Sequence, residues 1–318
     1  IDGRRIQPSS ADGAVDLNII PAALVGNVEV ITGGASIGQG FETVMAQVAA
    51  EFLGTDYRKM RVIHGQTNRI EHGIGAHASR ATVMTASATR VAALNVREKA
   101  LDMAAELLQS PADTLDIVNG EVVIAGRKSG PSVSLGQIAA ALGPSSKLRG
   151  NREPGLSSDG WFYTDHQVYP YGNHVAVVKV DPDTGGVKVL RYLVSYEIGR
   201  ALNPMLVKGQ IAGGFAQGLG GALMEEFTYN QRGDPLSSTF GDYLLPTVKE
   251  VPDIEIILTE DYPTPLNPLG IKGAGESGVN GVGAAIASAI DDAIGIPGAI
   301  TELPVTPQRL KAIIDGKR

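Results

Sequence analysis

The sequence contains no cysteine, and this absence excludes several kinds of site. Without a thiol, the chain can supply no disulfide, no thiolate ligand for zinc or for an iron–sulfur cluster, and no cysteine nucleophile. Any iron–sulfur centre that works with this protein must therefore lie elsewhere.

Long apolar runs and an excess of positive charge are also missing. No run approaches the roughly 18 apolar residues of a membrane span. The polar start, residues 1–13, lacks the apolar core of a signal peptide. We therefore expect a cytoplasmic protein with no membrane span. The net charge is −7, and no basic cluster is present to replace the counterions of a polyanion, so we expect no nucleic-acid partner.

Aromatic residues make up only 5% of the chain, whereas glycine occurs 40 times. So much glycine indicates many tight turns and close backbone approaches. It fits a backbone built around a ligand, and it equally fits a loop-rich fold. With 318 residues, of which 43% are hydrophobic, the chain is long enough to bury two cores.

The first half of the chain alternates between strand and helix periodicity. Residues 27–32 predict a strand, and a glycine-rich turn leads into a helix that runs from Phe41 until Gly54. Residues 60–64 predict a second strand. A long helix is expected at about 86–109, with an inward face made of Val91, Leu94, Leu101, Ala105 and Leu108.

The second half opens on the firmest local pattern, two alternating runs at 174–180 and 187–195 that predict an antiparallel hairpin. A strand is expected at 254–258. Two helices are also expected, residues 208–227 through Ile211, Phe215, Leu219 and Leu223, and residues 280–294 with Ala285, Ile286, Ala289, Ile290 and Ala293 inward.

These elements predict an α+β fold with two mixed lobes and antiparallel strand pairs. The segment 126–160 is rich in Gly, Pro and Ser, and we interpret it as the boundary between the lobes. The first lobe is accordingly residues 1–150 and the second 151–318.

Ser36 lies in a Gly-Ala-Ser-Ile-Gly segment that matches the nucleophile-elbow pattern of serine hydrolases. It even falls between a predicted strand and a predicted helix. Such an enzyme needs an acid and then a histidine later in the chain, yet the last histidine is His174 and almost half the chain lies beyond it. A serine hydrolase using Ser36 is kept as an alternative.

The segment 273–278, Gly-Ala-Gly-Glu-Ser-Gly, matches the dinucleotide-binding fingerprint. The strand that should precede it is missing, because residues 263–272 contain three prolines. Glycines at a helix amino terminus still make an anion site, but Glu276 in its middle would repel a phosphate. The acid therefore points to a different role.

The five histidines show no metal-ligand spacing. We expect no metal held by protein ligands, although a metal brought by an organic cofactor remains allowed.

Six segments occur in one order, spread from about residue 27 to about 308, and together they resemble a known family. They are SIGQGFETVMAQVAAEFLG, GIGAHASRATVMTASAT, YEIGRALNPMLVKGQIAGGFAQGLGGALMEE, FGDYLLPT, NPLGIKGAGESG and ELPVTP. The sequence resembles the carboxy-terminal molybdopterin-binding region of the molybdenum hydroxylases, the family of xanthine dehydrogenase, aldehyde oxidase and aerobic carbon monoxide dehydrogenase. The resemblance covers nearly the whole chain.

The family's large subunit carries a further, preceding molybdopterin-binding region that is not in this sequence. The chain therefore resembles a separate medium-type subunit, as in nicotinate dehydrogenase, or a fragment of a large one. The resemblance implies molybdenum–molybdopterin, as the cytosine dinucleotide. It also implies partner chains with the first molybdopterin-binding region, iron–sulfur clusters and FAD, and a small-molecule substrate.

The resemblance also marks residues that would bind the cofactor. They are Ile37, Gly38, Gln39, Gly40, Thr82, Thr85, Ser87, Gln217, Lys272, Gly273 and Gly275. The alternative is that these glycines and hydroxyls only turn the chain and cap helices. One departure is Glu197, where relatives commonly carry aspartate, and we interpret it as structural.

Glu276 matches the family glutamate that lies beside molybdenum without ligating it, so the resemblance implies a catalytic base. A carboxylate within hydrogen-bond reach can take the proton of the water-derived nucleophile as it attacks an electrophilic carbon. The implied reaction is hydroxylation of an aldehyde or N-heterocycle, or oxidation of CO. A non-catalytic subunit that only covers the cofactor is the remaining alternative.

Overall fold

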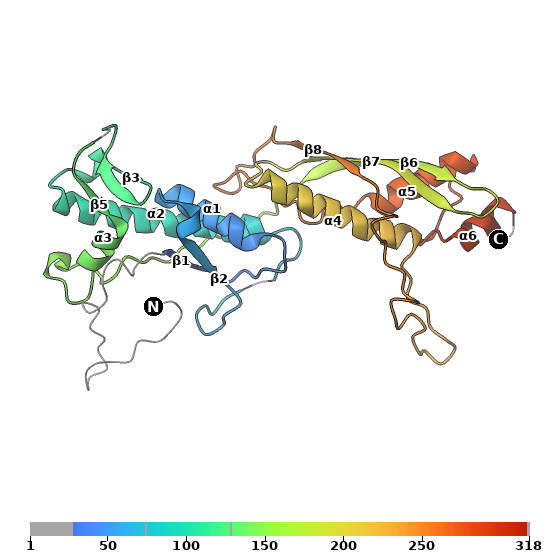
Figure 1. The fold of residues 1–318 in the computed structure, drawn as a ribbon, viewed down its shortest axis with the longest axis horizontal. Helices are drawn as coiled ribbons and strands as arrows, with labels where there is room; N and C mark the ends of the chain where they lie inside the picture. Colours follow the sequence, from blue (N-terminus) through green and yellow to red (C-terminus); the bar gives the residue numbers. More distant parts are fainter. Residues whose placement is uncertain (1–27, 74, 128, 317–318) are drawn as a thin grey trace. The chain divides into compact units, whose positions relative to one another are not determined.

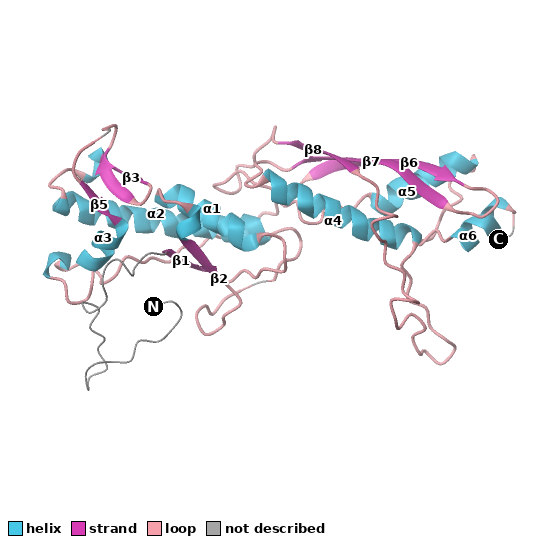
Figure 2. Cartoon of the chain, in the orientation of Figure 1, coloured by secondary structure: helices cyan, strands magenta, loops and turns pink. Residues whose placement is uncertain are grey.

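A computed structural model describes residues 28–73, 75–127 and 129–316. The polar start and Asn27, the first residue of the first predicted strand, lie outside these residues. Helices and strands alternate, with both antiparallel and parallel strand pairs, which confirms the α+β fold class (Figure 2). The described residues form two compact units, residues 28–76 with 84–163 (unit 1) and residues 77–83 with 164–316 (unit 2). The assignment of 1–150 and 151–318 to cofactor-binding lobes stays a prediction.

Unit 1 begins with a strand–helix–strand segment (Figure 1). β1 (Val28–Ile31), α1 (Phe41–Leu53) and β2 (Met60–Ile63) form where the periodicity predicts them. The two strands pair in parallel, and α1 connects them. The apolar side chains at helical spacing in α1 are buried. Gly54 ends the helix in a left-handed conformation, at a φ of 84°.

The rest of unit 1 contains most of α2 (Ala81–Leu107), from Met84 onward, a small antiparallel sheet and α3 (Leu135–Ala141). The sheet has the order β3 (Leu115–Val118), β4 (Glu121–Ile124), β5 (Ser132–Ser134). β5 and α3 lie inside the segment 126–160 that we interpreted as a boundary, and Ser134 and Gln137 form a capping box there. Short 3₁₀ helices occupy Tyr57–Lys59, Ala112–Thr114 and Lys147–Arg149.

The predicted inward face of α2 is correct in part, because Leu101, Ala105 and Leu108 pack against the buried cluster of unit 1. The large residues Val91, Leu94 and Leu101 are only half-buried. The fully buried positions of the helix are mostly small, and they include Ala86, Ala93, Ala100, Met103 and Ala104. Small side chains let a helix approach its neighbours closely, so burial here does not follow side-chain size.

Unit 2 is built on the sheet β6 (Tyr171–Val180), β7 (Val187–Glu197), β8 (Ile254–Thr259), in that order. The hairpin β6–β7 is antiparallel, as predicted, and β8 pairs in parallel with β7. The turn at 181–186 is closed by backbone hydrogen bonds between Asp181 and Gly186 and between Gly185 and Asp181.

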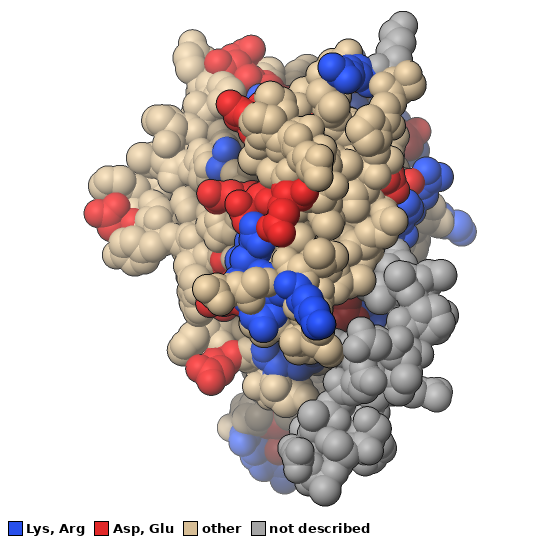
Figure 3. Space-filling model, turned by 90° about the vertical axis from the view of Figure 1, so that its left-hand side faces the viewer, with Lys and Arg blue, Asp and Glu red and all other residues tan. Residues whose placement is uncertain are grey.

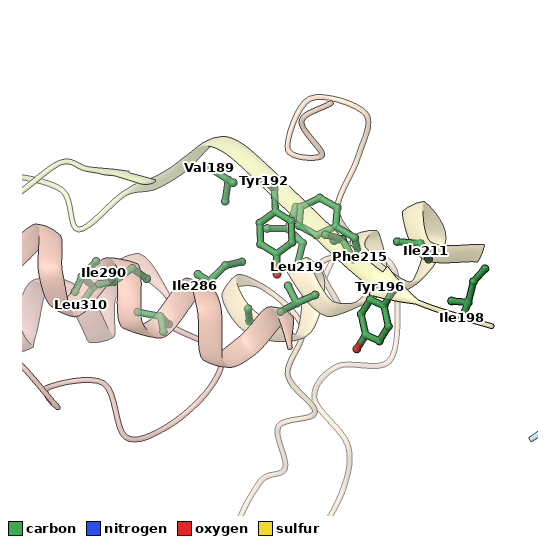
Figure 4. Close-up of a cluster of buried hydrophobic side chains, with 14 residues drawn as sticks. Val189, Tyr192, Tyr196, Ile198, Ile211, Phe215, Leu219, Ile286, Ile290 and Leu310 are labelled. Atoms are coloured by element: carbon green, nitrogen blue, oxygen red, sulfur yellow. The ribbon is translucent and has the colours of Figure 1, made fainter. Parts of the chain in front are cut away.

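Three helices complete unit 2, namely α4 (Pro204–Leu223), α5 (Val282–Ile294) and α6 (Pro307–Ile314). Figure 4 shows side chains of α4 and α5 packed against those of β7. Ile211, Phe215 and Leu219 on α4 are buried, as predicted. The helix starts earlier than predicted because Asn203 caps it, and it ends at Leu223 instead of 227.

On α5, the prediction is correct for Ile286 and Ile290 and wrong for Ala293, which is exposed. The buried stripe of this helix is Val282, Ile286 and Ile290, at a spacing of four residues. Ala293 lies beside the continuation of that stripe, not on it.

The loop between α4 and β8 forms an arm, residues 226–251, that projects from the rest of unit 2 (Figure 1). Its base is held by ion pairing of Arg309 with Glu226 at 2.6 Å and by a 2.6 Å hydrogen bond from the Tyr243 hydroxyl to Glu225. Along the arm, large apolar side chains are exposed, including Phe240 at 82% and Val248 at 90%.

Two surface properties bear on function. In the described part of the chain, no helix is both long and apolar enough to cross a membrane. The face in Figure 3 carries a group of basic side chains directly beside a group of acidic ones. One mixed group in unit 1 is Arg152 with Asp102 and Glu106.

Candidate functional site

The loop that carries Gln39 (residues 33–40, the Gln39 loop) joins β1 to α1 in unit 1. The Gln39 side chain accepts a hydrogen bond from the Ile37 amide at 2.7 Å and donates one to the Ala35 carbonyl at 3.2 Å. Gly38 and Gly40 have φ values of 103° and 80°, which favour glycine. Ile37 is 76% exposed. The loop therefore folds on its own glutamine and presents Ile37 outward.

Two more predicted residues lie in unit 1, on α2. The Thr85 hydroxyl lies next to the Gln39 loop, because a Cβ added at Gly34 would come within 3.0 Å of its oxygen. Ser87 is fully buried, with 0% exposure in this chain. Thr82 is half-buried and falls in the segment 77–83, which belongs to unit 2. The predicted hydroxyl residues thus differ widely in exposure and are divided between the units.

Ser36 does not have the surroundings of a hydrolase nucleophile. His64 bonds the backbone amide of Ser36 through Nδ1 at 3.5 Å and the carboxylate of Glu42 through Nε2 at 2.8 Å. The Ser36 hydroxyl itself bonds Glu42, and the pKa of Glu42 is lowered by its own backbone amide and then by His64 and Ser36. A serine nucleophile needs a histidine at its hydroxyl, so this geometry disfavours the hydrolase alternative.

Glu276 lies in unit 2 on the loop before α5 (residues 272–281, the Glu276 loop). Its carboxylate is exposed in this chain. Oε2 accepts a 2.8 Å hydrogen bond from the Ser79 hydroxyl, and the Glu276 amide donates to the same hydroxyl oxygen at 3.0 Å. Among the described residues, none donates a hydrogen bond to Oε1. Glu276 therefore has one oxygen fixed and one oxygen open to a proton.

His174 holds the next residue of this loop from inside unit 2. Its Nε2 lies 3.0 Å from the Ser277 carbonyl oxygen, and its Nδ1 lies 2.9 Å from the Tyr192 hydroxyl. Burial lowers the pKa of His174, although the hydrogen bond with Ser277 partly opposes this. A neutral ring then donates from Nε2 to the carbonyl and accepts at Nδ1 from Tyr192. The loop backbone is thereby tied to the buried Tyr192 of β7.

Lys272 begins the loop and is already paired. Its ammonium group bonds the Glu197 carboxylate, and both side chains are buried, at 10% and 5% exposure. Burial acts to raise the pKa of Glu197, but hydrogen bonds from Lys272, Gly199 and Tyr262 outweigh it, and the pKa is lowered. The contacts of Glu197 are those of a structural residue. A direct contact of Lys272 with cofactor stays a prediction.

Of the other predicted residues in unit 2, Gly273 is buried and Gly275 and Gln217 are exposed. A Cβ at Gly273 would come within 2.3 Å of the Ser79 carbonyl oxygen. Gln217 lies on α4 between Gly214 and Gly218, which pack against Gly278 and Val282 of the Glu276 loop and α5. Unit 2 thus gathers Gln217, Gly273, Gly275 and Glu276 around one loop and the helix beside it.

Sequence reasoning missed Ser79, although it lies within one of the six segments. Its partner Glu276 is 197 residues away in the sequence, and no local pattern reports such a distance. A sign is visible only in the backbone. Ala78 and Ser79 both have positive φ, at 51° and 52°, a conformation that is uncommon without glycine. Within the described residues, no group of three or more histidine, aspartate or glutamate side chains could hold a metal ion.

The sequence model of the molybdopterin cofactor-binding domain matches residues 12–252, about three quarters of the chain. The chain belongs to this family. It resembles the carboxy-terminal region of molybdenum hydroxylases, as its six segments indicated.

Among curated relatives, the 6-hydroxypseudooxynicotine dehydrogenase complex subunit gamma of Paenarthrobacter nicotinovorans is 43% identical over 298 residues, covering 94% of this chain and 37% of that one. The nicotine 6-hydroxylase large subunit of the same organism is 35% identical and covers 91% and 36%. The chain therefore spans little more than a third of the length of these relatives.

Solved structures agree on the fold. CO dehydrogenase from Oligotropha carboxidovorans is 30% identical with a TM-score of 0.81, over 92% of this chain and 36% of that one. Quinoline 2-oxidoreductase from Pseudomonas putida 86 is 33% identical with a TM-score of 0.79, over 92% and 37%. The chain has the fold of a molybdopterin-binding part of such enzymes.

Proposed function

We propose that this chain is the cofactor-binding catalytic part of an oxidoreductase complex in which Glu276 acts as the general base. The complex would hydroxylate an N-heterocycle or an aldehyde, or oxidise CO, with oxygen derived from water. The observation that carries the proposal is the Glu276 carboxylate, held by Ser79 at Oε2 and open at Oε1.

The residues present suit a hydrogen-bonding cofactor with a flat ring. Gly213 and Gly221 flank Gln217 by one turn each on α4, and an added Cβ at either would meet nothing within 4 Å. A ring system could therefore approach the α4 backbone beside the exposed Gln217 amide. Gly38 is equally open. Within unit 2 we propose Gln217 as a cofactor-binding residue, and within unit 1 we separately propose Gly38, Gln39 and Gly40.

When bound, the molybdenum cofactor supplies the two-electron redox chemistry and activates the water-derived oxygen. The chain's own contribution is the proton acceptor. A carboxylate with one oxygen fixed cannot turn freely, so its other oxygen has a defined direction in which to take a proton. General bases of this kind contribute about 10²–10⁴-fold to turnover.

The substrate class that we favour is the N-heterocycle. The names of two relatives refer to nicotine or a derivative, and that of one solved neighbour refers to quinoline. We further propose that partner chains carry the first molybdopterin-binding region, the iron–sulfur clusters and FAD. The absence of cysteine from this chain supports the iron–sulfur part. The cytosine dinucleotide form of the cofactor is part of the same proposal.

The test uses the purified native complex. We expect it to contain molybdenum and pterin and to turn over at least one of quinoline, benzaldehyde and CO with an electron-accepting dye. Glu276→Gln should keep the molybdenum content and lower turnover by about 10²–10⁴-fold. Glu302→Gln, which changes another exposed glutamate of unit 2, is the matched control and should behave as wild type.

An intact complex without molybdenum would overturn the cofactor assignment. If the Glu276→Gln complex contained molybdenum and kept full activity, the alternative of a non-catalytic subunit that only covers the cofactor would be favoured. Labelling of Ser36 by a fluorophosphonate would favour the hydrolase alternative instead.

A further inference from the structure

We propose that Ser79 is a positioning residue that fixes the direction of the Glu276 carboxylate. This inference rests on the proposed function of Glu276 as the base. The Ser79 hydroxyl makes two hydrogen bonds to Glu276, donating to Oε2 at 2.8 Å and accepting from the backbone amide at 3.0 Å. Ser79 belongs to the segment 77–83 of unit 2, so both partners lie in one compact unit.

One of the two bonds holds the carboxylate of Glu276, and the other holds the backbone amide of the same residue. A hydroxyl has a single proton to donate, and here it goes to the carboxylate. Because the same oxygen accepts from the amide of Glu276, the carboxylate is tied to its own backbone through Ser79. The rotamer of Glu276 is thereby restricted, and Oε1 is the oxygen left to accept a proton.

The position of Ser79 is itself fixed. Ala78 and Ser79 are consecutive non-glycine residues with positive φ, and such residues persist only where their surroundings hold them. The backbone of Ser79 packs directly onto Gly273, where an added Cβ would lie 2.3 Å from the Ser79 carbonyl oxygen. The Arg80 amide closes the turn by donating to the His77 carbonyl at 3.2 Å.

An ordinary role for a serine just before a helix is to cap it, and α2 starts at Ala81. The hydroxyl of Ser79 does not do this. Both of its hydrogen bonds go to a residue that follows much later in the chain and on a different loop. A strained turn that directs a hydroxyl at a candidate base fits positioning better than capping.

The experiment compares Ser79→Ala, Ser79→Gly and Ser288→Ala in the purified complex. Ser79→Gly removes the hydroxyl but suits the positive φ, so it separates the hydroxyl from backbone strain. Ser288 is an exposed serine on α5 and serves as the matched control. The measurements are kcat and KM across pH with the substrate that the wild-type complex turns over, together with molybdenum content and a crystal structure of Ser79→Gly.

We expect both Ser79 variants to lose about tenfold or more in kcat, as for a hydrogen bond to a charged group. KM and molybdenum content should stay within about twofold of wild type. The loss of kcat should be present at every pH measured. The crystal structure should show the Glu276 carboxylate in more than one rotamer.

Two results would overturn the inference while leaving the proposed function intact. One is wild-type kcat and pH profile in both Ser79 variants while Glu276→Gln is inactive. The other is loss of molybdenum, or a raised KM at unchanged kcat, which would make Ser79 a binding residue. Full activity in Glu276→Gln would instead overturn the proposed function, and this inference with it.

Discussion

The Gln39 loop and the Glu276 loop are both rich in glycine and both precede a helix, but they are held in different ways. Around Gly38, the Gln39 loop is folded by its own side chain, through bonds of Gln39 to Ile37 and Ala35, and only its Ser36 end is bonded from outside, by His64. The Glu276 loop is held from outside by Glu197, Ser79 and His174. A self-supporting loop can be changed locally, whereas an externally held loop depends on residues far away in the chain.

The strongest way to break this comparison is to remove the ion pair that starts the Glu276 loop. We expect Lys272→Met to destabilise unit 2 by about 3–5 kcal/mol, because it leaves the buried Glu197 carboxylate without its partner. Hydrogen exchange of β7 peptides in the purified complex measures this. Arg191→Met, which breaks an exposed pair with Glu255, should cost less than about 1 kcal/mol.

The ion pair of Lys272 with Glu197 also makes the stability of unit 2 depend on pH. Since the pKa of Glu197 is lowered from 4.5 in the folded chain, its contribution to stability is present above about pH 4.5 and is lost as pH falls through the lower folded value. In Lys272→Met this acid-induced loss should shrink, because little stabilisation of the carboxylate remains. A variant as stable and as acid-sensitive as wild type would contradict the external support of the loop.

A second change tests the packing of the Glu276 loop. An alanine at Gly278 would place its Cβ 2.1 Å from the Ile211 carbonyl oxygen on α4. Backbone atoms cannot move aside as a flexible side chain can, so we expect Gly278→Ala to cost about 3 kcal/mol. Faster hydrogen exchange in peptides from both α4 and the Glu276 loop would report this loss of stability. Faster exchange in the loop alone would contradict the contact between Gly278 and α4.

The smallest effect should come from Gly38→Ala in the Gln39 loop. An added Cβ there meets nothing within 4 Å, so the cost is only that of a positive φ of 103°. We expect about 1–2 kcal/mol, restricted to unit 1. Exchange in peptides from residues 33–40 measures it. A loss as large as that of Gly278→Ala would show that the Gln39 loop is not self-supporting.

The contrast between the loops also explains which parts of the fold could be predicted. The β6–β7 hairpin and the buried residues of α4 follow from short-range alternation and helical spacing, and the structure confirms them. The inward face of α2 was predicted only in part, because its most buried residues are mostly alanines, whose close packing depends on neighbours. β5 and α3 were missed because they are short and lie in a Gly- and Pro-rich segment.

For the candidate site, the sequence marked Glu276 through a resemblance and could not supply its surroundings. The contacts to Ser79, to His174 and between Lys272 and Glu197 span 197, 103 and 75 residues of sequence. Such pairings depend on topology, which periodicity does not encode. The family assignment therefore supplied the residue, and the structure supplied what holds it.

The arm, residues 226–251, bears on how this protein must be handled. Isolated exposed apolar residues are normal, but here Phe227, Tyr229, Leu236, Phe240 and Val248 are all exposed along one projecting loop. Exposed loops of this kind are preferred sites of proteolytic nicking. The practical consequence is for production: purified material should be checked for cleavage within the arm, and affinity tags belong well away from it.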